Sequence, residues 1–288
     1  MDYILHLAIL VIIYAILGLS LNLVVGYTGL LASGHAAFYG IGAYATAILT
    51  ASLGVNFFVS MAAGIIASAG AAFLIGAVLS RFDGDYYALV SLGFNVIIYS
   101  VFLNWQGLTR GPLGIPGVPR PALFGIEFSS GVFFLALAAF FLALSFLAAR
   151  FVARSSFGRV LKSIREDEKA IQVFGYNTVY FKLAIFVISA GMAAVAGSLL
   201  SSYITFVDPS SFTVMESVFI LAIIIFGGLS SLKGSVVGAL VLVLLPEALR
   251  FAGFPQSLAA QMRQGVYGLF LIALMLYRPQ GLFGEFKL

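Results

Sequence analysis

Residues 130–150 read SGVFFLALAAFFLALSFLAAR, and no charged residue precedes the final arginine. A helix of about 20 such residues is about 30 Å long, which is the thickness of the hydrocarbon core of a bilayer. Comparable apolar segments lie near residues 4–25, 30–52, 57–80, 86–106, 183–206, 213–229, 234–251 and 264–278. The pattern predicts an all-α polytopic membrane protein with roughly 8–10 transmembrane or re-entrant helices, in a single domain over residues 1–288.

The composition supports this class. The chain is 62% hydrophobic and 9% charged, whereas soluble domains carry about 25% charged residues. This excludes an ordinary soluble enzyme, and a β-barrel would show short alternating segments instead. The absence of cysteine excludes disulfides and thiol catalysis, and with only two histidines we expect no metal site and no cofactor. We expect no nucleic-acid partner, because the positive charge is mostly local to one loop.

Two apolar stretches are interrupted by glycines. Residues 30–52 and 213–251 contain so many small residues that we predict broken or re-entrant helices there. Irregular backbone at membrane depth persists only where it is buried in protein or lines a polar cavity. The chain starts Met1-Asp2-Tyr3 without basic residues, so the first apolar run is expected to be a retained span rather than a cleaved signal.

One long polar segment, residues 151–182, interrupts the apolar sequence. Its basic cluster, with the residue before it, holds nearly half of the 15 basic residues: Arg150, Arg154, Arg159, Lys162, Arg165, Lys169 and Lys182. The positive-inside rule places this loop in the cytoplasm. Four apolar segments follow, so the C-terminus is expected on the same side and the N-terminus outside, unless an early segment is re-entrant.

The loop at 107–129 is then expected outside, despite Arg110 and Arg120. Residues 106–121 consist of turn formers and are predicted not to be helical. Two interpretations stay open for this loop: a plain connector, or a rigid platform for an external partner.

The polar segment itself predicts two short helices. Val160, Ile164, Ile171 and Phe174 would share one face of a continuous helix, but Asp167 falls within that stripe. We therefore predict a break near 166–167, with one helix over about 158–165. A second helix would start with Glu166, Asp167 and Glu168 at its positive end and end at a left-handed Gly175. Two such helices on the membrane face would form a docking surface for a soluble partner; the alternative is a solvated loop that carries only topology signals.

A second block covers residues 26–44. Its glycines loosen the helix and let backbones approach closely, and a histidine in an apolar span is costly unless it is hydrogen-bonded or faces water. His35 is either a satisfied packing residue or part of an unwound turn that offers backbone dipoles to a zwitterionic solute. Ser33 beside it makes no hydrolase, because no acid lies nearby. The candidate pathway residues are Gly29, Ser33, Gly34, His35, Phe38, Gly42 and Tyr44.

The remaining polar positions have structural explanations. Residues 227–234 are not a phosphate-binding loop, because Lys233 precedes the last glycine, and we predict a tight turn between two helices. Asp208 is a predicted N-cap before Pro209, Glu216 lies near a helix start, and Glu247 and Arg250 are spaced to pair. A proton-coupled carrier would need some of these as relays. No catalytic constellation is present, so we predict no enzyme activity.

Taken together, the blocks resemble the LivM-type permease subunit of branched-chain amino-acid ABC importers. The resemblance rests on residues 26–44, 109–116, 158–182, 227–238 and 278–284. It implies a second, LivH-like permease, two ATP-binding subunits and a periplasmic or extracellular amino-acid-binding protein, in the plasma (inner) membrane of a bacterium or archaeon. It also implies that the ATPase-coupling residues are Gly158, Arg159, Ile164, Arg165, Glu166, Asp167, Glu168, Gly175 and Asn177.

The chain departs from the family pattern at a few positions. Leu30 and Ala32 replace Gln and Ser, and Ser230 replaces a glycine that the family favours. Because the first two changes remove polar groups from the block nearest the predicted pathway, the solute class stays open. The alternatives are urea or short amides, or a stand-alone secondary amino-acid carrier with broken helices.

Overall fold

A computed structural model describes residues 2–82, 84–123, 126–128, 130–251, 265, 268–269, 272 and 280–284. The described structure is almost entirely helical, which confirms the predicted class. The long helices are α1 (Asp2–Thr28), α2 (His35–Ala47, continued by the π-helical turn η1, Ile48–Ser52), α3 (Phe57–Leu79), α4 (Asp85–Asn104), α6 (Gly131–Arg154), α9 (Thr178–Ile204), α10 (Val214–Gly227) and α11 (Leu232–Phe251). Two short helices, α7 (Ser156–Glu166) and α8 (Glu168–Val173), connect α6 to α9.

Five described helices are long and apolar enough to cross a membrane: α1, α3, α4, α6 and α9. The pair α10 and α11 is a sixth candidate that is bent by 119° at its break. Helix α2, with 13 residues, is about 20 Å long and too short to cross alone. The stretch 213–251 is therefore broken as predicted, whereas in 30–52 only residues 30–34 are non-helical and the helix from His35 continues to Ser52. The predicted segment 264–278 lies outside the described residues, apart from four helical positions.

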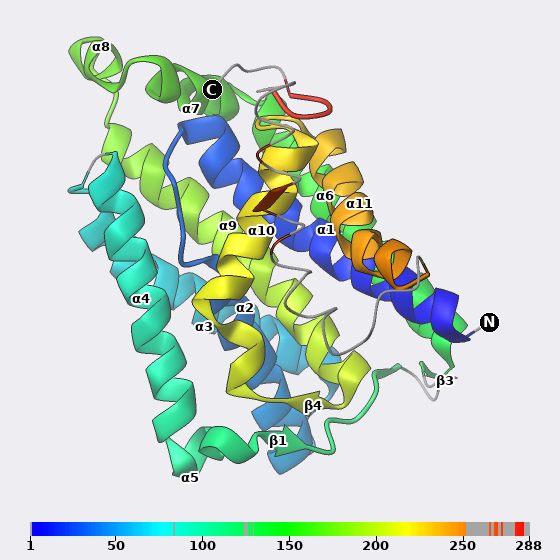
Figure 1. Cartoon of the computed structure of the whole chain (residues 1–288). Helices are drawn as coiled ribbons and strands as arrows, with labels where there is room; N and C mark the ends of the chain where they lie inside the picture. Colours follow the sequence, from blue (N-terminus) through cyan, green and yellow to red (C-terminus); the bar gives the residue numbers. More distant parts are fainter. Residues whose placement is uncertain are drawn as a thin grey trace.

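Helix α9 lies at the centre of the bundle, where α1, α2 and α3 pack around it (Figure 1). Small residues make this packing close: a Cβ on Gly42 would lie 2.4 Å from the Ala194 Cα, and one on Gly197 would lie 2.1 Å from the Tyr39 carbonyl oxygen. Hydroxyls join the same helices, as between Thr46 and Ser198 at 2.7 Å. Helices in a bilayer associate through this close packing and hydrogen bonding, because burial from water contributes little there.

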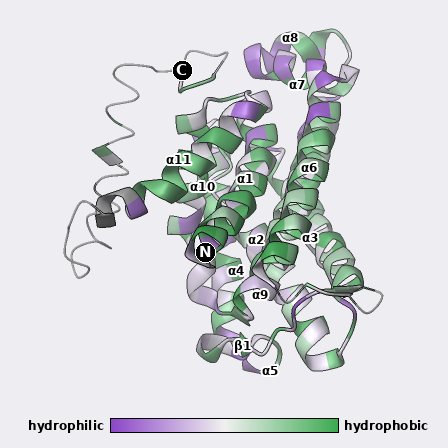
Figure 2. Ribbon diagram, turned by 90° about the vertical axis from the view of Figure 1, so that its right-hand side faces the viewer, coloured by the Kyte–Doolittle hydropathy of each residue, from purple (hydrophilic) through white to green (hydrophobic). Residues whose placement is uncertain are grey.

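The ends of the molecule differ in polarity. Helices α7 and α8 form a hydrophilic cap at one end, while α1, α6 and α11 are mostly hydrophobic (Figure 2). The opposite end carries α5 (Gln106–Thr109), η2 (Gly111–Leu113), β1 (Ile115–Pro116), β2 (Ala122–Leu123), β3 (Ile126–Glu127), β4 (Phe206–Val207) and η3 (Pro209–Phe212). Strand β1 pairs antiparallel with β4, Ile115 opposite Val207, and β2 pairs with β3. This arrangement agrees with the expectation that residues 107–129 and 151–182 lie on opposite sides.

The loop at 106–121 corrects one expectation. It was predicted to lack helix, but Gln106–Thr109 form a helical turn. The reason is Thr109, whose hydroxyl donates to the carbonyl oxygens of Phe102 at 2.7 Å and Trp105 at 2.8 Å and so closes the turn. Arg110 then leaves the helix in the left-handed conformation, with φ of 59°.

Candidate coupling helices and solute pathway

The break between α7 and α8 falls where the sequence predicts it. Asp167 is extended, and its carboxylate Oδ1 accepts a hydrogen bond from the Ala170 N–H at 3.0 Å, so it caps α8. Gly175 follows α8 with φ of 87°, as predicted for a left-handed C-terminal residue. Helix α7 starts earlier than predicted, because the Ser155 hydroxyl accepts from the Gly158 N–H at 3.2 Å and caps it.

Helix α7 buries one face against the bundle. Gly158, Leu161 and Ile164 are buried, whereas Arg159 and Glu166 are exposed. Gly158 lies against the end of α6, since a Cβ there would be 2.4 Å from the Val152 carbonyl oxygen. A continuous stripe is not formed, as the predicted break implies, and α8 leaves Phe174 exposed.

Arg165 joins α7 to two other parts of the chain. Its Nη1 donates to the carbonyl oxygen of Gly26, at the end of α1, and to the Ser230 hydroxyl at 2.8 Å, in the turn between α10 and α11. The Ser230 hydroxyl in turn donates to the Gly26 carbonyl. Burial lowers the pKa of the Arg165 guanidinium, and neighbouring Glu166 opposes that shift. Hydrogen bonds from a guanidinium are among the stronger ones in proteins, so α7 is firmly joined to both elements.

Asn22 holds the same turn from within α1. Its fully buried carboxamide donates to the Ser231 carbonyl at 3.1 Å and the Ser235 hydroxyl at 2.7 Å, and accepts from the Ser230 N–H at 3.0 Å. Ser230 is left-handed, with φ of 62°, a conformation that favours the glycine typical of the family. Its side-chain and backbone hydrogen bonds offset that strain. Sequence reasoning missed Asn22, although an asparagine inside an apolar span is a signal for such a contact.

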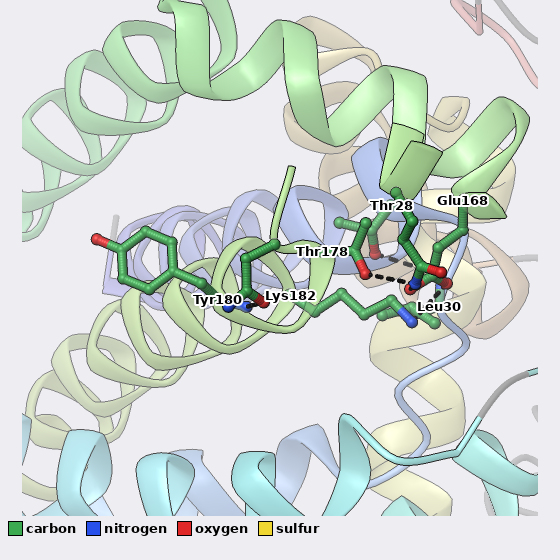
Figure 3. A network of polar contacts seen from close by, with 8 residues as sticks. Thr28, Leu30, Glu168, Thr178, Tyr180 and Lys182 are labelled. Carbon is green, nitrogen blue, oxygen red and sulfur yellow. Dashed lines mark hydrogen bonds and ion pairs between the residues drawn. The ribbon is translucent and has the colours of Figure 1, made fainter. Parts of the chain in front are cut away.

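Glu168 and Lys182 join α8 to α9. Their ion pair is 2.6 Å long, and the lysine side chain is 2% exposed. Figure 3 shows Lys182 reaching from α9 toward Glu168 beside the turn at Thr28 and Leu30. Asn177 caps α9 by accepting from the Tyr180 N–H at 3.2 Å. Of the predicted coupling residues, Glu168 therefore holds α8 to α9, and Asn177 caps the start of α9.

The tip of α8 is apolar and exposed. Val173 and Phe174 are 86% and 78% exposed, and Tyr176 beside them is also exposed. We call these three residues the α8 tip. Large apolar side chains gathered on the hydrophilic end of a membrane protein are typical of a protein contact site. The sequence pattern did not single out Val173 or Tyr176.

The predicted pathway residues lie on an extended strap, residues 29–34, and on α2. Gly29 covers Arg165, because a Cβ there would be 3.1 Å from the arginine Cγ. The Ser33 N–H donates to the Ser91 hydroxyl at 2.9 Å, and a Cβ on Gly34 would lie 2.1 Å from the Ser91 carbonyl oxygen. The strap confirms the unwound turn, and it lies between the end of α1 and the start of α2.

The other pathway candidates are buried within the bundle. His35 Nε2 lies 2.7 Å from the Ser20 hydroxyl, which is the satisfied packing arrangement. The Phe38 ring centroid is 5.3 Å from that of Phe94 on α4, and Tyr44 stacks on Phe102 at 4.3 Å. The structure thus brings these residues to the contacts of α2 with α4 and α9. Their role in conducting solute stays a prediction.

Comparison with known proteins gives a consistent result. Residues 3–275 match the family described as the permease component of branched-chain amino acid transport systems. The chain is 38% identical to the high-affinity branched-chain amino acid transport system permease protein LivM of Salmonella typhimurium, over 96% of this chain and 69% of that protein. It is 29% identical to the LivH permease protein of Escherichia coli, over 94% of this chain and 91% of that protein.

A more distant relative is the probable branched-chain amino acid transport permease protein LivM of Methanocaldococcus jannaschii, at 24% identity over 95% of this chain and 91% of that protein. No solved structure matches the chain. A family match over nearly the whole length, joined to the bundle of apolar helices and its polar cap, identifies the chain as a member of the branched-chain amino acid transport permease family.

Proposed function

We propose that this chain is the membrane-spanning permease subunit of an ATP-driven importer of branched-chain amino acids, as a multi-pass protein of the plasma (inner) membrane. The observation that carries the proposal is the 38% identity to a LivM permease over almost the whole chain. The apolar helices supply the membrane-embedded body. All of residues 1–288 act as one transmembrane domain.

The energy source is expected on other subunits. The glycine-rich segment at residues 227–234 has the wrong order for a phosphate-binding loop, because Lys233 precedes its last glycine. We therefore infer that two ATP-binding subunits hydrolyse the nucleotide, and that this chain has no ATPase site. A LivH-like second permease would complete the membrane part, and an extracytoplasmic binding protein would deliver the solute.

Helices α7 and α8 are the inferred docking site for an ATP-binding subunit. The α8 tip supplies apolar anchors, and exposed Arg159, Glu166 and Asp167 supply a polar rim, which is the usual composition of a protein interface. Gly158, Ile164 and Arg165 hold α7 on the bundle, while Glu168, Gly175 and Asn177 set the position of α8. The nine predicted coupling residues thus divide into contacting and positioning groups.

A displacement of α7 would be transmitted to the bundle through the hydrogen bonds of Arg165. Its two acceptors lie at the end of α1 and in the α10–α11 turn. Gly29, the first residue of the strap at 29–34, covers the arginine side chain. A displacement of α7 therefore pulls directly on the element that leads into α2. We infer alternating access in which nucleotide-driven closure of the ATP-binding subunits shifts α7 and re-tilts the glycine-rich helices.

A branched-chain amino acid needs apolar walls and a few dipoles. Phe38 and Tyr44 provide aromatic surface, while the strap provides backbone N–H and carbonyl groups near Ser33, Gly34 and His35. Such a pathway need not bind tightly, because a deep energy well would slow release of the solute. Gly29 and Gly42 permit the close backbone approach that the closed arrangement requires.

The test uses the complete complex in proteoliposomes, with the binding protein and radiolabelled leucine outside and ATP inside. Substituting the α8 tip with Val173→Asp and Phe174→Asp should abolish co-purification of the ATP-binding subunits and uptake, while the chain remains folded. The matched control is Leu113→Asp, because Leu113 is 82% exposed at the opposite end, and it should leave co-purification unchanged.

Three results would contradict the proposal. Normal co-purification and uptake with the α8 tip variant would remove the docking claim. ATP-dependent uptake of urea but not of leucine would assign another solute class. Accumulation of leucine by the purified chain alone, without nucleotide, would make it a secondary carrier.

A further inference from the structure

The contact between α2 and α4 contains buried polar groups that have no hydrogen-bond partner among the described residues. Asn95 lies in the middle of α4 and is fully buried. Neither its amide nitrogen nor its oxygen has a hydrogen-bond partner among the described residues. The same holds for the buried hydroxyl of Tyr44 on α2, whose ring stacks on Phe102 of α4. Unpaired polar groups at membrane depth are costly and rare, so they call for an explanation.

Asn95 lies within the α2–α4 contact because of its spacing along α4. Ser91, one turn earlier, packs against Gly34, and Phe102, two turns later, stacks on Tyr44. Phe94, the residue next to Asn95, packs on Phe38. The carboxamide therefore lies along α4 between two contacts with α2.

Most other buried polar groups of the described residues are paired, with the hydroxyls of Tyr39 and Ser202 as exceptions. Asn22, the other fully buried asparagine, makes three hydrogen bonds, and His35 is bonded to Ser20. Thr46 and Ser198 bond to each other. Since these buried polar groups are hydrogen-bonded, a general failure of the fold to pair polar side chains does not explain why Asn95 has no partner.

Helix α4 is also the candidate membrane span with the least contact to the rest of the bundle. It is the least buried and the least apolar of the five single-helix spans. Its outer face is exposed along Val96, Ile97, Ser100, Val101, Asn104 and Trp105. A helix with few internal contacts can separate from its neighbour at low cost, and here separation would open the α2–α4 contact and uncover Asn95.

We propose that the α2–α4 contact is a solute-binding site that opens during transport, with Asn95 as its main polar contact; this rests on the proposed function. The carboxamide donates from its nitrogen to the carboxylate of an α-amino acid, and its oxygen accepts from the ammonium. The Tyr44 hydroxyl donates to the carboxylate. Phe38, Phe94 and Phe102 contact the aliphatic side chain. In the closed arrangement these polar atoms stay unpaired, which favours reopening.

The experiment measures leucine uptake by the complete complex in proteoliposomes, together with ATP hydrolysis and thermal stability. Asn95→Leu keeps the branching of the side chain and removes both unpaired polar atoms, so its Tm should equal or exceed that of the wild type. Its uptake should fall about tenfold or more, the effect of losing one or two hydrogen bonds to a charged solute. Hydrolysis stimulated by the binding protein should persist. Asn104→Leu, on the outer face of the same helix, is the matched control and should retain uptake.

Tyr44→Phe is the second variant, since it removes only the hydroxyl and keeps the ring on Phe102. It should raise the KM for leucine several-fold at unchanged Tm, and it decides the question if Asn95→Leu fails to assemble. A purely structural role is assigned if both variants assemble and show wild-type KM and maximal rate, which overturns the proposal. If the wild-type complex does not import leucine at all, the proposed function fails instead, so the two failures are distinguishable.

Discussion

Removal of the Glu168 carboxylate should release α8 from the bundle. Glu168→Gln leaves the ammonium of Lys182, which is 2% exposed, without the carboxylate that lies 2.6 Å away. Breaking a buried ion pair from one side costs about 3–5 kcal/mol. We expect about 3 kcal/mol, because the new carboxamide keeps some hydrogen bonding and other contacts of Lys182 remain. That free energy corresponds to about a 100-fold larger population of the undocked segment.

The assay is hydrogen exchange measured by mass spectrometry over residues 168–182. Amides that exchange through local opening report the free energy of that opening, so their exchange should be up to about 100-fold faster in Glu168→Gln. Glu166→Gln is the matched control, because Glu166 is exposed one turn away on α7, and its exchange should match the wild type.

A double variant tests the pairing itself. Lys182→Met combined with Glu168→Gln replaces the ion pair by two neutral side chains, and such replacements are often close to neutral. Exchange in the double variant should therefore return toward the wild-type rate. The reasoning is refuted if Glu168→Gln exchanges at the wild-type rate, or if the double variant is as destabilised as the sum of its single changes.

Two further predictions concern packing and capping. Gly42→Ala should lower the Tm in detergent, because its Cβ would lie 2.4 Å from the Ala194 Cα and overpacking costs about 1–3 kcal/mol. The control Gly70→Ala, whose Cβ would have nothing within 4 Å, should leave the Tm equal or higher. Equal losses of Tm in both variants would contradict the packing argument. Asp167→Ala should destabilise α8 by about 1 kcal/mol through loss of its N-cap, and it should speed hydrogen exchange over residues 168–173. Asp167→Asn keeps a capping oxygen and should not speed exchange. Equal exchange in the two variants would show that the cap contributes nothing.

The helix positions were predictable because the bilayer imposes a local rule. Each span needs about 20 apolar residues, and the predicted 57–80 and 130–150 correspond to Phe57–Leu79 and Gly131–Arg154. The break at Asp167 was predictable for a similar reason, because a carboxylate cannot lie in a buried stripe but can cap a helix. These inferences use only neighbouring residues.

The contacts of the candidate sites were not predictable in the same way. Arg165 bonds to Gly26, which is 139 residues away along the chain, and Ser230 bonds to Asn22 across 208 residues. Nothing in the spacing of these residues pairs them. The exposure of Phe174 was not predictable from the helical period alone, because it depends on how α8 is placed against α9 by contacts such as the Glu168–Lys182 ion pair.

The amino-acid sequence determined that this chain lives in a membrane, where its helices begin and end, and which end is polar, because a hydrocarbon solvent selects long apolar helices residue by residue. Only the tertiary structure decided that Arg165 connects α7 to α1 and the α10–α11 turn, and that Asn95 is buried without a partner among the described residues. Those properties arise from helices distant in sequence meeting at fixed angles, and the packing of small residues such as Gly42 and Gly197 sets that geometry.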